Sequence, residues 1–192
     1  GVVRLRRRGD DWAWWRTTLW VLGWLVWVYF TSGPPEIWGR VLFSVHMIMH
    51  MGVAMILPLL LVPATPITLA LRALPSRKDR TWGPRELLLQ VVHSRAMRFL
   101  ANPVVAALLF FVSLAIFYWS PTFELALTTH TGHLLMMAHF VLTGYLFVWV
   151  LIGTDPGPPK WSPLMLLVIL FATIAFHAFF GVALTDILRL SI

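Results

Sequence analysis

The sequence contains no cysteine among its 192 residues, and charged residues make up only 12% of it. The first absence excludes disulfides and thiolate metal sites, so any metal ion would have to be held by His, Met or carboxylate side chains. The charged fraction is about half that of an average soluble domain, whereas hydrophobic residues reach 59%. Because a water-soluble chain of this length needs more polar surface, the composition predicts a membrane protein.

Several functional motifs are also missing. The sequence has no internal repeat, no glycine-rich nucleotide-binding loop and no Ser-His-Asp arrangement, so we expect no enzymatic activity. The predicted spans contain essentially no carboxylate, which argues against a proton or ion transporter. Acidic residues are few, which leaves a net charge of +7. In a chain this apolar, such a charge is typical of the cytoplasmic face of a membrane protein, and we expect no nucleic-acid partner.

Five apolar stretches are predicted to form transmembrane helices, at residues 17–31, 41–62, 103–119, 131–152 and 163–184. We therefore predict an all-α fold, a polytopic membrane helical bundle that forms one domain over residues 1–192. Pro58 is expected to kink the second span because it removes a backbone donor. The chain begins with Gly1 instead of Met, so we expect it to be a processed form or, as the preferred alternative, part of a longer protein.

The segment 71–98, between the second and third spans, is polar and basic. Within it, Pro84–Phe99 is predicted to form one amphipathic helix on the membrane surface, with Leu87, Leu88, Val91 and Phe99 inward. If the spans alternate, this segment lies on the same side as the N-terminus and the turn at 155–160. That side carries thirteen of the fifteen Lys and Arg residues, which predicts a cytoplasmic N-terminus.

Two histidines, His46 and His50, lie four residues apart in the second predicted span, within the run FSVHMIMHM. Four residues of helix rotate about 400°, so the two imidazoles share one face. Neutral imidazoles beside thioethers are suitable ligands for a soft metal ion. One helix cannot close such a site, so further ligands are expected on other spans.

The helical rise places six of the seven histidines in the outer half of the predicted bilayer, on three spans. They form two predicted layers: a mouth layer of His46, His130 and His133, and a deeper layer of His50, His139 and His177. Methionines lie beside them in the second and fourth spans. The candidate metal ligands are His46, His50, His130, His133, His139, His177, Met47, Met49, Met51, Met136 and Met137.

Each of these residues also has an ordinary structural interpretation. A lone histidine inside a membrane is usually a neutral group that forms hydrogen bonds between helices, and methionine is a common packing residue. Six histidines on one side of the bilayer favour a metal or cofactor site, because each unpaired polar group in hydrocarbon is costly.

The chain resembles the multi-spanning CtaG-type cytochrome c oxidase assembly factors, which are bacterial membrane proteins linked to copper supply. The resemblance covers nearly the whole chain. It is carried by FSVHMIMHM at 43–51, LVPATPITLALRALP at 61–75, SPTFELALTTHTGHLLMMAHF at 120–140, IGTDPGP at 152–158 and FHAFFGVAL at 176–184. Members of this family usually continue through further spans, and actinobacterial ones can follow a copper-resistance-type membrane domain.

The resemblance implies copper handling on the periplasmic side of the bacterial cell membrane, carried by the six histidines. Imidazoles and thioethers favour Cu(I). The expected partners are apo-subunits of cytochrome c oxidase, a periplasmic copper donor and membrane lipid. The alternative is a haem-binding electron carrier, in which His50 with His139 or His177 would supply the two axial ligands.

Overall fold

The computed structural model describes residues 1–39, 41–75, 82–157 and 161–190, with the backbone alone at 43, 123, 124, 127 and 184–190. Every regular element in the described part of the chain is helical, as predicted. In chain order these are α1 (Val2–Arg7), α2 (Trp14–Ser32), α3 (Pro34–Trp38), α4 (Phe43–Met51), the π-helical turn η1 (Gly52–Ile56), α5 (Leu57–Leu61), α6 (Pro66–Ala73), α7 (Pro84–Val92), α8 (Arg95–Leu100), α9 (Pro103–Tyr118), α10 (Thr122–Thr128), α11 (His130–Ile152) and α12 (Pro163–Leu190).

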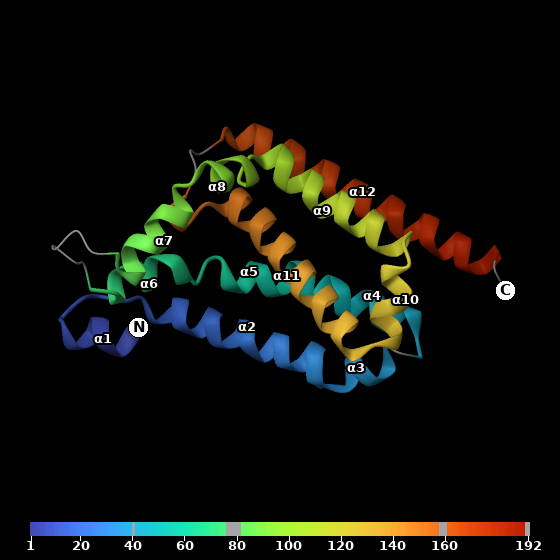
Figure 1. The fold of residues 1–192 in the computed structure, drawn as a ribbon, viewed down its shortest axis with the longest axis horizontal. Helices are drawn as coiled ribbons and strands as arrows, with labels where there is room; N and C mark the ends of the chain where they lie inside the picture. The colour runs from blue at the N-terminus through green and yellow to red at the C-terminus, as the bar shows by residue number, and fades with distance from the viewer. Residues whose placement is uncertain (40, 76–81, 158–160, 191–192) are drawn as a thin grey trace.

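Long helical segments run alternately between two ends of the molecule (Figure 1); they are α2, α4–η1–α5, α9, α11 and α12. Three segments, Ser44–Leu61, His130–Ile152 and Pro163–Ala183, are long and apolar enough to cross a membrane. Helix α9 is apolar but shorter, with 16 residues. These features confirm the predicted helical membrane bundle. The crossing of the bilayer by all five segments stays a prediction.

The second long segment is wound differently from the predicted kinked α-helix. A π-helical turn, η1, separates α4 from α5 and is followed directly by Leu57 and Pro58. Pro58 has no N–H for the carbonyl of Ala54, and a π-helical turn is a known way to absorb such a local change. Gly144 of α11 lies against that same carbonyl, so closely that a Cβ at this position would overlap it.

This close approach gives a testable expectation. Replacing Gly144 with alanine is expected to lower the free energy of unfolding by about 1–3 kcal/mol, because a backbone carbonyl cannot move aside as a side chain can. The measurement is the thermal unfolding midpoint in detergent. Gly181→Ala is the matched control, since a Cβ at Gly181 meets no atom within 4 Å. A Gly144→Ala midpoint equal to that of the control would contradict the packing.

The main core lies where α4, η1, α9 and α11 meet. Its fully buried side chains include Val53, Leu57, Phe110, Met137 and Phe140. In contrast, only 11% of the Pro163–Ala183 window of α12 is buried inside the protein. Most apolar side chains of this window therefore face outward, as expected for a helix in contact with lipid.

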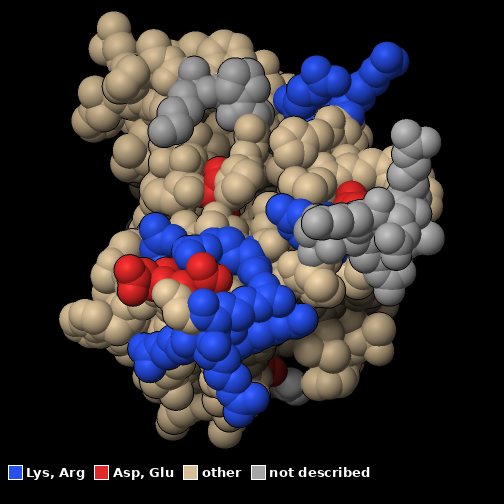
Figure 2. All heavy atoms as spheres, turned by 90° about the vertical axis from the view of Figure 1, so that its left-hand side faces the viewer, with Lys and Arg blue, Asp and Glu red and all other residues tan. Residues whose placement is uncertain are grey.

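The end of the molecule formed by α1, α6 and α7 is basic, and we call it the basic end. Figure 2 looks onto this end and shows Lys and Arg side chains gathered across it. Exposed arginines of the segment 71–98 include Arg72, Arg95 and Arg98. Arg77, Lys78 and Arg80, which belong to the same predicted segment, lie outside the described residues.

The single amphipathic helix predicted for Pro84–Phe99 is wrong in one respect. The segment forms two helices, α7 and α8, that separate at His93 and Ser94. The Ser94 hydroxyl accepts a hydrogen bond from the Met97 N–H at 3.1 Å, so it begins a new helix at that point. Leu87, Val91 and Phe99 are exposed, by 49%, 55% and 66%, and can therefore contact lipid.

A second difference lies between the third and fourth predicted spans, where no helix was predicted from the sequence. Thr122–Thr128 forms α10, which packs against α11. Thr129 then adopts an extended backbone, and its hydroxyl accepts a hydrogen bond from the Gly132 N–H at 3.1 Å. This N-cap fixes where α11 begins, and so fixes the positions of His130 and His133 on its first turn.

Asp155, in the turn after α11, is buried and caps α6. Its carboxylate accepts hydrogen bonds from the backbone N–H groups of Ile67 at 3.2 Å and Thr68 at 2.9 Å. The first N–H groups of a helix lack partners within the helix and carry partial positive charge, so a carboxylate there is favourable. Asp155 thus joins the end of α11 to the start of α6 at the basic end of the molecule.

Candidate metal site

The structure brings together the three histidines of the predicted mouth layer, at the end of the molecule opposite the basic end. His46, His130 and His133 line a small pocket with a volume of about 40 Å³, which we call the His133 pocket. Met49 and Glu36 line it too. Glu36 belongs to α3, whose last turn approaches α4 closely because Gly39 has no side chain: a Cβ there would lie 3.4 Å from the Cα of His46.

Glu36 supplies a charge that the sequence interpretation did not assign to the site. Its Oε2 atom lies 3.5 Å from Nε2 of His133, and both side chains are largely buried, with 16% and 13% exposed. A buried carboxylate requires a positively charged or hydrogen-bonding partner. Protonated His133 is one such partner, and a metal ion bound between the two side chains would be another.

His46 and His50 form a hydrogen-bonded pair. Their Nε2 atoms lie 2.8 Å apart, and both side chains are buried. One ring must donate a proton and the other accept it. If the Nε2–H of His50 donates this hydrogen bond, Nδ1 of the same ring carries a lone pair that can bind a metal ion. Metal-binding histidines usually donate a hydrogen bond from the ring nitrogen that does not bind the metal.

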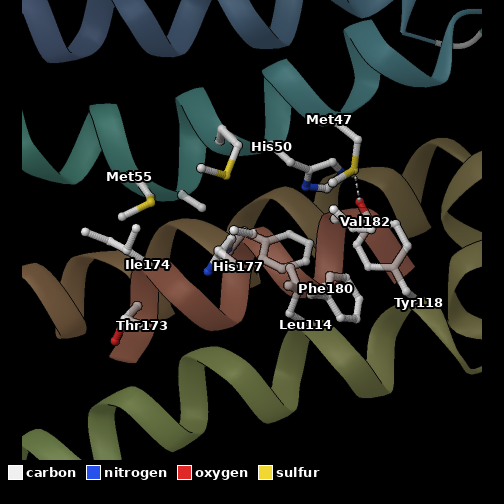
Figure 3. A pocket seen from close by; sticks show the side chains of 15 residues that line it. Met47, His50, Met55, Leu114, Tyr118, Thr173, Ile174, His177, Phe180 and Val182 are labelled. Carbon is white, nitrogen blue, oxygen red and sulfur yellow. Dashed lines mark hydrogen bonds between the residues drawn. The ribbon is translucent and has the colours of Figure 1, made fainter. Parts of the chain in front are cut away.

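His50 also lines a second and larger cavity of about 570 Å³, which we call the His50 cavity. Figure 3 shows His50 and His177 approaching it from facing helices, α4 and α12. Within the described part of the chain, the buried Nδ1 atoms of both rings lack a hydrogen-bond partner. Two buried nitrogens without partners on one cavity are suited to a ligand that would coordinate them.

Three methionines face the same cavity: Met47, Met51 and Met55. They are spaced by four residues, and each such step of α-helix rotates about 40° beyond a full turn. The π-helical turn η1 has more residues per turn and brings Met55 back toward the line of the other two. The Tyr118 hydroxyl donates a hydrogen bond to the Met47 sulfur at 3.3 Å (Figure 3).

The predicted deeper layer is therefore wrong in one member. His50 and His177 share a cavity, but His139 lines a different one with Ser113, Phe117 and Met136. His139 is exposed at the side of α11. The helical rise gives the depth of a residue but not the direction of its side chain, and α11 turns His139 away from His50.

The predicted methionine ligands fall into two groups. Met47 and Met51 line the His50 cavity, and Met49 lines the His133 pocket. Met136 and Met137 are core residues, 3% and 1% exposed, and line neither space. Their position agrees with the ordinary use of methionine as packing material.

As the side chains stand, no three His, Asp or Glu residues in the described ranges converge closely enough to hold one metal ion. Methionine sulfur is not among these groups, and sulfur is what the His50 cavity adds. Two residues of these spaces were missed in the sequence, Glu36 and Met55. The four-residue spacing from Met51 could have indicated Met55, whereas nothing in the sequence places Glu36 beside His133.

These features define a helical membrane protein that gathers buried histidines and methionines near one end. A family model described as "Cytochrome c oxidase caa3 assembly factor (Caa3_CtaG)" matches residues 1–187. The chain belongs to this family.

Long relatives occur in mycobacteria. The chain is 44% identical to an uncharacterized protein of Mycobacterium leprae, and 43% identical to uncharacterized proteins of Mycobacterium bovis and Mycobacterium tuberculosis. Each match spans 185 residues, which is 96% of this chain but 28% of the relative. No solved structure matches the chain.

Proposed function

We propose that this protein holds Cu(I) in the His50 cavity and delivers it to an apo-subunit of cytochrome c oxidase. The observation that carries the proposal is the shared lining of this cavity by two histidines and three methionines from facing helices. Imidazole and thioether ligands favour Cu(I) over harder divalent ions. Membership of an oxidase assembly family supports the oxidase as the recipient.

The ligand set also suits a protein that must release its ion. Thioethers are neutral and exchange readily, and Met51 is 39% exposed at the side of the cavity. A recipient could therefore approach ligands of the site without unfolding the bundle. A transfer role needs coordination of this open kind, whereas a permanent metal centre is closed by all of its ligands.

The placement in the membrane is part of the proposal. We place the basic end in the cytoplasm, because Lys and Arg concentrate on cytoplasmic loops. The His133 pocket, at the opposite end, then opens on the periplasmic side of a bacterial cell membrane. A periplasmic donor would load copper into the His50 cavity from that side of the membrane, while anionic lipid headgroups contact the arginines of the basic end.

Metal analysis of the full-length protein, purified under reducing conditions, tests this function. We expect copper to co-purify as Cu(I) and to be removed by a strong Cu(I) chelator. In cells lacking the protein, membranes should contain cytochrome c oxidase deficient in copper. A protein that takes up no Cu(I), or full copper occupancy of the oxidase without it, would rule out the proposal.

A second candidate has support from the same cavity. His50 and His177 lie on one cavity of about 570 Å³, and two histidines on facing helices can bind the iron of a haem. The three methionines favour copper, since haem with two histidine ligands does not need them. A Soret absorption band in the purified protein would favour the haem-binding electron carrier, and its absence together with bound copper would exclude it.

A further inference from the structure

The His133 pocket differs chemically from the His50 cavity. It combines the Glu36 carboxylate with the imidazoles of His46, His130 and His133, and a single thioether, Met49. Carboxylate and imidazole ligands suit divalent ions of borderline character, such as Zn²⁺, Co²⁺ and Cu²⁺, better than Cu(I). The two spaces are therefore expected to select different ions.

From this difference we infer that the His133 pocket is a second metal site, specific for a divalent transition-metal ion, in which Glu36 is a ligand. The inference depends on the proposed function in one respect: the Cu(I) site, with which this second site is contrasted, is itself proposed. Glu36 and His133 already lie 3.5 Å apart, from Oε2 to Nε2. Two ligands at about 2.0–2.1 Å from one ion lie roughly 3.4 Å apart in tetrahedral geometry, so this pair already has a suitable spacing. A further ligand can come from His130, which lines the same pocket. His46 is not counted as a ligand, because its Nε2 atom is hydrogen-bonded to Nε2 of His50.

Charge and space favour this occupant. The pocket volume of about 40 Å³ leaves room for roughly three water molecules, which suits one metal ion with a bound water and is too small for most organic ligands. A divalent ion bound here would also place positive charge beside the Glu36 carboxylate, which is largely buried.

The position of the pocket gives it access from outside. His130 is exposed at the first turn of α11, and His133 is partly buried one turn further along. Helix α3, which carries Glu36, lies beside α4 (Figure 1). The residue that ends α3, Gly39, approaches the Cα of His46. An ion can therefore enter past His130 without passing through the His50 cavity.

Titration of the metal-free chain in detergent with Co²⁺ tests the inference, because cobalt bound by nitrogen and oxygen ligands absorbs visible light. We expect one bound Co²⁺ per chain. Glu36→Gln and His133→Ala should each weaken Co²⁺ binding by at least about tenfold. Losses of this size already occur when a residue that only supports a metal ligand is replaced. Glu86→Gln, the same substitution on α7 at the basic end, is the matched control and should bind Co²⁺ as the unmodified chain does.

Cu(I) binding, measured by competition with a chromophoric chelator, is followed in the same samples. Glu36→Gln should keep its Cu(I) affinity, which also shows that the variant is folded. Met51→Leu should lose Cu(I) affinity and keep Co²⁺ binding. If the chain binds Cu(I) but no Co²⁺, or if Glu36→Gln binds Co²⁺ normally, Glu36 and His133 form only an ion pair, and the inference fails while the proposed function stands. Loss of Cu(I) binding alone would defeat the proposed function and leave this site intact.

Discussion

Alanine in place of either His50 or His177 is expected to weaken Cu(I) binding by more than about 100-fold. This loss exceeds that caused by replacing a residue that only supports a metal ligand. Each ring lines the His50 cavity and carries a buried Nδ1 atom that has no hydrogen-bond partner among the described residues. Removing one of them leaves too few nitrogen ligands, and the remaining thioethers are weak donors. The measurement is the Cu(I) dissociation constant of the purified variants, obtained by chelator competition.

Two histidine variants serve as controls. His139→Ala should bind Cu(I) normally, because His139 lines a different cavity. His93→Ala should also have no effect: its Nδ1 atom lies 2.8 Å from the Leu89 carbonyl, on α7 at the basic end. If His139→Ala removed Cu(I) and His177→Ala did not, the assignment of the cavity would be wrong.

Labelling of single cysteines should give an all-or-none result. The chain contains no cysteine of its own, so one can be placed at Thr122, the first residue of α10, or at Gln90 of α7. Both positions are exposed. In intact cells, a membrane-impermeant thiol reagent should modify Thr122→Cys and spare Gln90→Cys, because cytoplasmic loops are the ones enriched in Lys and Arg.

Both variants should react fully once the membrane is made permeable, which controls for accessibility. Modification of Gln90→Cys alone in intact cells would reverse the orientation and move the His133 pocket to the cytoplasm. Equal labelling of both in intact cells would show that the two ends do not lie on opposite sides.

The helices could be predicted from the sequence because long apolar runs have few alternatives in a membrane. The starts of α9 and α12 were predicted at the observed residues, Pro103 and Pro163, since proline is favoured at the first turn. The short helices were harder to foresee. Whether Thr122–Thr128 forms α10 depends on its packing against α11, and short helices are rarely stable without such contacts.

The sequence predicted which helices carry the six histidines, but not which of their side chains meet. The six lie on α4, α11 and α12, as predicted, and their depth in the bilayer stays a prediction. Their partners depend on how each helix is rotated. A rotation error of one residue is about 100°, enough to move a side chain from a cavity to the lipid. His139 shows the consequence, as does Glu36, which meets His133 only because the short helix α3 folds back over α4.

The link between Asp155 and α6 has a consequence for biosynthesis. The carboxylate that caps α6 follows Ile67 and Thr68 by 88 and 87 residues in the chain. At a translation rate of about 5–20 residues per second, the ribosome makes it roughly 4–18 seconds after the helix it completes. Until then the first N–H groups of α6 must be hydrated or bound by another molecule, so this helix takes its final position only after α11 has been synthesised. Insertion factors could therefore act on the half-made chain during that interval.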